Sequence, residues 1–535
     1  MKRAIQSFIA NFNPRGLQVL FMGCITGFLV GVIVTFYNIL ASIGEGFASN
    51  AYAYIRTHWF LIPLLLAVLA ASALIVGVAV KLAPMLRGSG IPQTEGVARG
   101  IFKIKWFSLL CGKFALSLAC IFLGLCAGGE GPSIQMGGAL GYGSSKLFSR
   151  MDMLRRYQVT GGACAGLAVA FNAPLTGMAF AFEETHKKFS PEVFICAFSS
   201  VVTGVLTRNL IRAGLGLSTS AAFTSFAFLS LPYTAYGYLV LAALAVSLLG
   251  VGFYYLTFLL DRLVKEKLTF AKNTGKMLLP FLLAGVFGLI TVYATGGGHA
   301  LIEALGTLGG TREMAVEQAF FLGLGGTIAL ALVFKLILTL LNIVCGVPCG
   351  VFIPMLAVGA AAGALCSLFC TEFLGMDPSY SDIMTFICMA AFFTCVVRAP
   401  ITGIVMVFEL TWSFTALLPV VVGVAIGYMV GEIARTQPIY EVLLEQQTSE
   451  KEQTEVKQVL SFILPVRAQG IVDGLAIKDV LWPTGAMVKG ILRGEERVTP
   501  TAETLLLAED IITVEVQTSD GEGVEKELNL LTGNK

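Results

Sequence analysis

Glycine or proline interrupts the sequence at four places, and three of these also carry a hydroxyl or a carboxylate. They are Gly88-Ser-Gly-Ile-Pro92, Gly128-Gly-Glu-Gly-Pro132, Gly350-Val-Phe-Ile-Pro354, and Tyr440 shortly after Pro438. Glycine lets backbone approach a ligand closely, and proline suits the first turn of a helix, where amide N–H groups lack helical partners. Because such amides favour negative charge, the chemistry that these segments could perform is the binding of an anion.

Each segment also has a second interpretation when it is taken alone. The segment around Ser89 could be a loop between helices, and the one after Gly350 could be an ordinary Gly-Pro bend. Glu130 could neutralise the positive end of its helix, or it could occupy a site meant for an anion. Tyr440 could donate its phenolic hydroxyl inward, or it could anchor the chain at a membrane interface.

The fractions of hydrophobic and charged residues indicate that membrane helices must position these residues. Of 535 residues, 56% are hydrophobic and 13% are charged, whereas soluble domains carry about 25% charged residues. The composition excludes a disordered chain, a coiled coil and a disulfide-stapled module, and the net charge of +2 argues against a nucleic-acid partner. We therefore expect a polytopic, all-α membrane protein whose partner is the lipid bilayer.

The apolar stretches differ in length. The run Leu17–Leu40 is longer than the apolar core of a signal peptide and is long enough for a first membrane helix. Lys2, Arg3 and Arg15 precede it, which predicts a cytoplasmic N-terminus. Many later runs are too short for a crossing or are interrupted by glycine and proline. Broken helices at membrane depth occur where backbone is buried in protein or lines a cavity, as in transporter binding sites.

An internal repeat relates the two halves of the chain. Residues 171–183 and 397–409 both contain Ala-Pro-apolar-Thr-Gly, then four apolar residues, then Phe-Glu, at an offset of 226 residues. The breaks at Pro132 and Pro354 form a second matched pair upstream. Two related halves are therefore predicted, and inverted repeats of this kind are common in transporters.

Charge is unevenly divided along the chain. Residues 1–440 hold 27 Lys and Arg against 17 Asp and Glu, whereas residues 441–535 hold 9 against 17. All 12 cysteines lie in the first part. This shift predicts a domain boundary near residue 440. The predicted units are a transmembrane domain over 1–440 with repeats at roughly 17–215 and 230–440, a linker over 441–460, and a soluble domain over 461–535.

Taken in this order, the motifs resemble those of the CLC family of chloride channels and chloride/proton antiporters. The resemblance runs from about Leu17 to Glu441 and includes the Gly-Gly-Gly-His299 stretch. It implies a CLC-type inverted repeat of broken and tilted helices, and a homodimer in which each subunit has its own pore. The implied location is the cell (plasma or inner) membrane, with multiple crossings and both termini cytoplasmic.

The resemblance also implies roles for individual residues. Ser89 and Tyr440 would donate hydroxyls to a central chloride, and the backbone N–H groups of Val351 and Phe352 would complete that site. Glu130 would be the gating glutamate, which occupies the outer anion site when ionised and leaves it when protonated. The residues implied to support the site are Gly88, Gly90, Gly131, Gly350 and Lys113. Gly129 departs from the family pattern, where this position is often Arg or Lys, so anion affinity and conduction rate are in doubt.

The Glu183-Glu184 pair distinguishes two functions within the family. The resemblance assigns internal proton transfer to Glu184 and a secondary, structural role to Glu183, which implies exchange of chloride for protons. Alternatively, both acids are polar residues at a helix end, followed by His186 and two lysines, and the protein is a passive voltage- or pH-gated chloride channel. A more remote alternative is a fluoride/proton antiporter, although Ser89 favours chloride.

An intramembrane enzyme is a further remote alternative. His58, His186 and His299 are the only histidines, and none is spaced to activate Ser89 as a nucleophile. The Cys345/Cys349 pair has helical spacing, but it lacks a ligand-rich loop and is interpreted as buried thiols. We therefore expect neither an enzyme, nor a cofactor, nor a metal.

The C-terminal part contains short β-rich segments. We expect strands at 475–480, 487–492, 497–499 and 511–516, with turn residues between them. Residues 481–511 resemble the small C-terminal domain of potassium-uptake regulators, called the TrkA C-terminal or regulator-of-potassium-conductance domain. This resemblance implies a cytoplasmic α+β domain that either stabilises a dimer or senses a small-molecule ligand.

Overall fold

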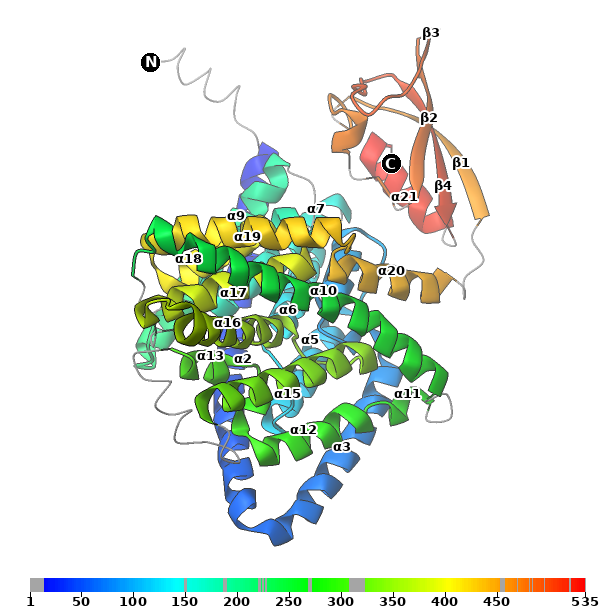
Figure 1. Ribbon diagram of the computed structural model, residues 1–535. Helices are drawn as coiled ribbons and strands as arrows, with labels where there is room; N and C mark the ends of the chain where they lie inside the picture. The colour runs from blue at the N-terminus through cyan, green and yellow to red at the C-terminus, as the bar shows by residue number, and fades with distance from the viewer. Residues whose placement is uncertain are drawn as a thin grey trace.

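The computed structural model describes most of the chain (Figure 1). The described residues are 14–148, 152–185, 190–219, 223, 226, 229–267, 272–306, 323–452, 458–468, 470–480, 482–483, 485–494, 496–518 and 521–534. Within them the chain is mainly helical up to residue 452, and a small sheet with one helix follows. The expected all-α membrane region with an α+β C-terminal part is confirmed.

The helices form two series that match in order. The first series is α2 (Pro14–Thr57), α3 (Ile62–Leu82), α4 (Ile91–Ala98), α5 (Trp106–Phe122), α6 (Glu130–Phe148), α7 (Asp152–Phe171), α8 (Pro174–Phe180) and α9 (Pro191–Gly214). The second is α10 (Tyr236–Lys267), α11 (Lys272–Gly275), α12 (Leu278–Ile290), α13 (His299–Ala304), α15 (Gly323–Cys345), α16 (Phe352–Leu374), α17 (Ser381–Val397), α18 (Pro400–Thr411) and α19 (Leu417–Ile433). Helix α20 (Ile439–Glu452) follows both.

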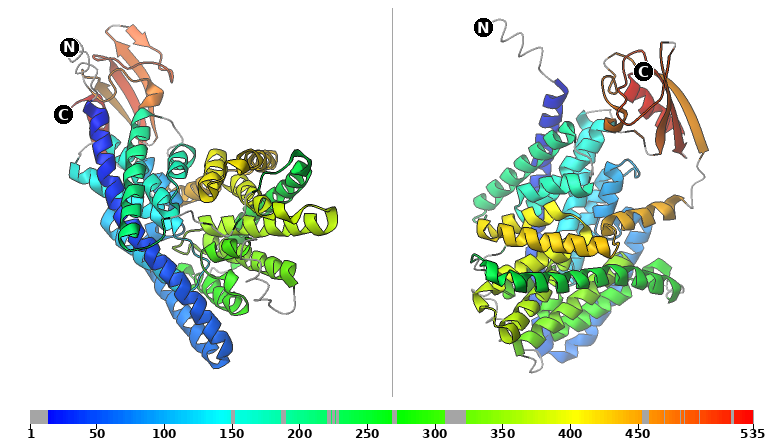
Figure 2. Two further views of the ribbon diagram at one scale, coloured as in Figure 1. Left: turned by 90° about the vertical axis from the view of Figure 1, so that its left-hand side faces the viewer. Right: turned by 45° about the horizontal axis from the view of Figure 1, so that its top comes forward.

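Among the described residues, 8 helices are long and apolar enough to cross a membrane. The expected first membrane helix lies within α2, which continues to Thr57. Helices α16 and α17 are the most enclosed, since 78% and 89% of their most apolar windows are buried inside the protein. The two series form two lobes in the left view of Figure 2, blue to cyan and green to yellow.

Glycines allow the helices of the first lobe to touch backbone to backbone. A Cβ at Gly137 of α6 would lie 2.1 Å from the carbonyl oxygen of Gly162 in α7, and the reverse distance is 2.2 Å. Small residues give membrane helices this close approach, which gains van der Waals contact where lipid offers no hydrophobic driving force. Helix α6, which begins at Glu130, is thereby held firmly against α7.

The sequence repeat corresponds to a reciprocal contact between the lobes. Glu183, which follows α8, accepts hydrogen bonds from two amides in the first turn of α18, at 2.8 and 2.6 Å. Glu409, in α18, accepts from two amides in the first turn of α8, both at 2.7 Å, and from the Thr176 hydroxyl. Each carboxylate thus satisfies the unpaired N–H groups and the positive end of the other repeat's Ala-Pro helix.

The C-terminal part is a four-stranded antiparallel sheet in the order β1-β4-β2-β3. Its elements are β1 (Gln458–Pro465), β2 (Ala486–Arg493), β3 (Glu496–Val498), β4 (Ile511–Thr518) and α21 (Gly521–Thr532). The expectation of a strand at 475–480 was wrong, because its amides bond to loop carbonyls of Thr504 and Ala502 and it forms a turn. Strand β1 was missed because it begins within the polar segment interpreted as a linker.

One ion pair holds the end of strand β2 to the turn before β4. Arg493 donates to both carboxylate oxygens of Asp510, at 2.7 and 2.8 Å, and the Leu507 amide donates to the second oxygen at 2.9 Å. Burial raises the pKa of the Asp510 carboxyl, but the hydrogen bonds and charge of Arg493, with the Leu507 amide, outweigh it and leave this pKa below its usual value. Folding therefore favours the charged form of Asp510.

We expect Asp510→Asn to lower the free energy of unfolding of the C-terminal part by about 1–2 kcal/mol, since water screens part of the interaction with the half-exposed arginine. In the wild type, the Asp510 carboxylate contributes fully to the free energy of unfolding above its unfolded-state pKa of about 3.9. This contribution is lost as the pH falls through its lower pKa in the folded state. Denaturant-dependent proteolysis of the full chain at pH 3 to 7 measures both effects. Lys478→Gln, which removes an exposed pair with Glu503, is the matched control, and an equal loss there would contradict the assignment.

Candidate functional site

The segment Gly88-Ser-Gly90 forms the turn that enters α4. Its glycines have φ of 69° and 96°, a region that residues with a Cβ adopt only with strain. From α5, the ammonium of Lys113 donates to the Gly88 carbonyl at 2.6 Å. Ser89 is 7% exposed, and its oxygen accepts a long hydrogen bond of 3.4 Å from the Ile91 amide. The hydroxyl hydrogen of Ser89 is therefore available for donation.

The starts of α6 and α16 are joined through their backbones. Gly128 and Gly350 exchange two hydrogen bonds, with N···O distances of 2.8 and 2.9 Å, and each helix begins within two residues of this pair. A Cβ at Gly131 would lie 2.7 Å from the Ser89 carbonyl oxygen and 3.1 Å from the Gly350 Cα. The glycines thus allow the three predicted segments to meet at one place.

Val351 and Phe352 lie at the start of α16, with 3% and 0% of their surfaces exposed. Their amides belong to the part of a helix that has no helical acceptor, and they carry its positive end. The Phe352 ring packs against Phe171 and Phe393, with centroids 5.4 and 4.9 Å away. These contacts fix the start of α16 between helices α7 and α17.

Tyr440 lies in the first turn of α20 and is completely buried. Among the described residues, its hydroxyl has no hydrogen-bond partner. Leaving such a group unsatisfied costs about 1–3 kcal/mol, so a hydrogen-bond acceptor beside this hydroxyl would be stabilised. Glu130 and Glu184 both interact electrostatically with this phenol, so Tyr440 lies near both acids.

Glu130 opens α6 and is 4% exposed. Its carboxylate interacts with the backbone amide of Ile353, in the first turn of α16. Its Oε2 atom has no hydrogen-bond partner within the part of the chain that the structure describes. The carboxylate thus lies at the same helix end as the amides of Val351 and Phe352, where a bound anion would also lie.

The adjacent acids Glu183 and Glu184 have different surroundings. Both lie in a single π-helical turn, Ala181–Thr185, that follows α8. Glu183 caps α18, as described above, whereas Glu184 is 2% exposed and lies near Tyr440. Consecutive residues of a helical turn project in different directions, so these neighbours meet different partners, and Glu184 lies on the side of the predicted anion site.

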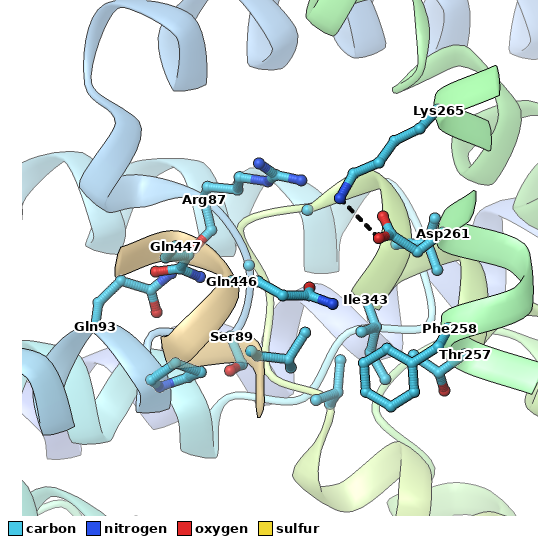
Figure 3. Close-up of a pocket in the computed structure, with 16 residues that line it drawn as sticks. Arg87, Ser89, Gln93, Thr257, Phe258, Asp261, Lys265, Ile343, Gln446 and Gln447 are labelled. Carbon is cyan, nitrogen blue, oxygen red and sulfur yellow. Dashed lines mark hydrogen bonds and ion pairs between the residues drawn. The ribbon is translucent and has the colours of Figure 1, made fainter. Parts of the chain in front are cut away.

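A pocket lies beside this site (Figure 3). Ser89 and Val351 are among its lining residues, and parts of α4, α10, α15 and α20 bound it. Its polar lining residues include Arg87, Gln93, Asp261, Lys265, Gln446 and Gln447. Lys265 is paired with Asp261 at 2.8 Å, so with Arg87 the lining has a positive formal charge.

The structure adds residues that the sequence analysis missed. Lys335 of α15 donates to the carbonyls of Thr295 and Gly296 at 2.9 and 2.8 Å, in the glycine turn before α13. It supports this turn in the same way that Lys113 supports the turn before α4. The offset from Lys113 to Lys335 is 222 residues, the same as that between Pro132 and Pro354, and this signal was available in the sequence.

Two further residues near Glu130 were not assigned to the site from the sequence, although His299 belongs to a stretch that the family resemblance includes. Glu45 of α2 accepts a hydrogen bond from the Gly297 amide at 2.8 Å, and both Glu45 and His299 interact electrostatically with Glu130. They come from helices α2 and α13, which are distant in sequence. Only the packing of the two lobes brings them close to Glu130.

Fold and site together define a multi-pass membrane protein in which two related halves bury helix N-termini at their interface. Residues 71–432 match the family model described as voltage gated chloride channel. The H(+)/Cl(-) exchange transporter ClcA of Vibrio parahaemolyticus is 31% identical over 461 residues, which cover 83% of this chain and 93% of that protein. The chain therefore belongs to the voltage-gated chloride channel, or CLC, family, and the resemblance found in the sequence is confirmed.

Solved structures support the same architecture. A slow cyanobacterial Cl-/H+ antiporter has a TM-score of 0.71 at 25% identity, over 82% of this chain and 100% of that one. A CLC-type fluoride/proton antiporter has a TM-score of 0.62 at 19% identity, over 80% of this chain and 98% of that one, and shows the fold alone. The predicted CLC-type arrangement of inverted repeats and broken helices is therefore confirmed.

We expect Gly131→Ala to weaken chloride binding about tenfold, because the added methyl would press on the Ser89 carbonyl and separate α4 from α16. Isothermal titration calorimetry with chloride measures this effect. Gly252→Ala in α10 is the matched control, since a Cβ there meets nothing within 4 Å. Equal affinity in both variants would mean that the contact at Gly131 does not shape an anion site.

Proposed function

We propose that the protein is a chloride/proton antiporter. The observation that carries this proposal is the position of the Glu130 carboxylate at the positive end of α16, beside the amides that would bind chloride. A carboxylate and an anion cannot both occupy this end when both are charged. Protonation of Glu130 would therefore make room for chloride, which couples the two ions. The relatives named as H(+)/Cl(-) exchangers support this choice.

Within this proposal, the central chloride accepts hydrogen bonds from Ser89 and Tyr440 and from the amides of Val351 and Phe352. The buried and unsatisfied Tyr440 hydroxyl supports its part. Gly88, Gly90, Gly131 and Gly350 allow these segments to approach one another. Lys113 acts through the Gly88 carbonyl, which it holds at 2.6 Å, and adds positive potential behind the turn.

Glu184 supplies protons from the inner side, and Glu130 carries them onward. The electrostatic proximity of both acids to Tyr440 supports a proton path that passes beside the chloride site. Glu183 has a secondary role, because both of its oxygens cap α18. Exchange of this kind moves ions without making or breaking covalent bonds in a substrate, so we assign no enzymatic activity.

The proposal extends to location and assembly. We infer that the protein lies in the cell membrane, with the start of α2 and the C-terminal sheet on the cytoplasmic side. Both lie at one end of the molecule (Figure 2), and basic residues precede α2 in the sequence. A homodimer, and dimerisation or ligand sensing by a TrkA-C-like domain over 461–535, rest on the sequence resemblance alone.

A passive chloride channel is the second candidate, because the family model that matches the chain is described as a voltage gated chloride channel. Chloride-loaded vesicles with simultaneous pH recording separate the two functions. Uphill proton movement driven by a chloride gradient supports antiport, whereas chloride flux without proton movement favours the channel. Absence of any anion flux would contradict both.

Substitution of Glu130 tests its exchange with chloride. We expect Glu130→Ala to abolish proton coupling while chloride still passes, since the helix end then lacks its competing carboxylate. Glu130→Gln should also stop proton transport, because an amide does not titrate. Acid activation of chloride flux should largely disappear in both variants. Retained uphill proton transport in either one would show that another group carries the proton.

The paired acids test the proton path. We expect Glu184→Gln to stop proton transport and to leave chloride flux, with some acid activation remaining because external protons still reach Glu130. Glu183→Gln should affect coupling less, and should instead lower stability by about 1 kcal/mol because it weakens a helix cap. Vesicle pH recordings and thermal unfolding measure the two effects. Full proton pumping in Glu184→Gln would contradict this assignment.

A further inference from the structure

Helices α4 and α20, which begin at the two predicted hydroxyl donors, are joined by one arginine. Arg99 ends α4 and lies 2.5 Å from Glu95 of the same helix and 3.5 Å from Glu441 of α20. Glu95 is 2% exposed, and Glu441 directly follows Tyr440. Arg99 therefore connects the last turn of α4 to the first turn of α20.

The two helices also pack directly against each other. A Cβ at Gly96 would lie 2.4 Å from the Phe102 ring and 3.0 Å from the Leu444 side chain. The absence of a side chain at Gly96 thus allows α20 to approach α4. This contact and the ion pairs of Arg99 set the spacing of the two helices. Because each hydroxyl lies at or just before the start of one helix, a change in that spacing would change the distance between the Ser89 and Tyr440 hydroxyls.

A second arginine joins this helix pair to the C-terminal sheet domain. Arg156 of α7 donates to the Trp482 carbonyl at 3.0 Å and to the Glu527 carboxylate of α21 at 2.7 Å. The same guanidinium lies over Gly100, where a Cβ would be 2.5 Å from its Nη2 atom. Gly100 has a φ of 81° and directly follows Arg99, at the end of α4.

These contacts form a continuous path. It leads from Glu527 through Arg156 to the end of α4, and from there through Arg99 to α20. The side chains of Arg156 and Glu527 are 8% and 19% exposed, so solvent screens their pair less than a surface pair. Apolar side chains extend the interface, since Val19 and Tyr157 belong to the same buried cluster as the sheet core.

We propose that Arg99 is a positioning residue that sets the distance between the Ser89 and Tyr440 hydroxyls, and that Arg156 transmits the docking of the C-terminal domain to it. The inference rests on the proposed chloride function. Neither arginine touches the anion. Undocking of the domain would release the end of α4, change the geometry of the hydroxyl pair, and thereby lower chloride affinity.

Calorimetry with chloride and flux kinetics on the full-length protein test the first part. Arg99→Gln is expected to weaken chloride binding about three- to tenfold and to raise the KM for chloride more than it lowers kcat. Arg99→Lys should restore most of the affinity, because it keeps the positive charge. Arg262→Gln, which breaks an exposed ion pair with Glu266 on α10, is the matched control and should bind chloride as the wild type does.

Glu527→Gln tests the second part without altering the membrane region. It should weaken chloride binding at least twofold. The double variant with Arg99→Gln should lose less chloride affinity than the product of the two single fold-changes, because both changes act through the same contacts. Wild-type affinity in Arg99→Gln would overturn the positioning role, and wild-type affinity in Glu527→Gln would overturn the link to the C-terminal domain. If the wild-type protein itself bound no chloride, the proposed function would fail instead.

Discussion

Buried helix N-termini are the constraint on which the rest of this structure depends. A helix that starts inside a membrane protein presents amides without helical acceptors and a partial positive charge, and no bulk water is present to satisfy them. Near Ser89, the mutual Gly128–Gly350 pair gives acceptors to two amides that precede α6 and α16, and Lys113, itself a donor, adds positive charge behind the turn. The remaining donors explain how a protein with few charges could attract an anion without placing a basic side chain in direct contact with it.

The same chemistry serves two purposes in the two repeats. At α8 and α18, Glu409 and Glu183 use both carboxylate oxygens to cap the opposite repeat, which fastens the lobes together. At α16, the Glu130 carboxylate meets a helix end while one of its oxygens has no hydrogen-bond partner among the described residues. A fully bonded carboxylate is a structural cap, whereas an incompletely bonded one can leave. This difference in bonding, rather than residue type, separates the proposed gating acid from Glu183 and Glu409.

The C-terminal sheet domain docks where it can influence this site. Its contact through Arg156 reaches the end of α4, and Ser89 lies two residues before the start of this helix. A short buried helix transmits a displacement at one end to the other because its backbone hydrogen bonds keep it rigid. Helices α4 and α20 also line the pocket beside Ser89, so a change in their spacing would alter both the predicted anion site and this pocket.

The sequence by itself determined the membrane class, the family, the repeat and the identity of the broken segments, because glycine, proline and apolar patterning act locally and leave a readable order. It also contained the offset that relates Lys113 to Lys335. Only the tertiary structure showed what each of the two adjacent acids meets, since Glu183 caps α18 and Glu184 lies near Tyr440. The strand at 458–465 and the partners of Arg99 and Arg156 were likewise decided by long-range pairing. Those contacts depend on how distant segments pack, and local composition carries no record of that packing.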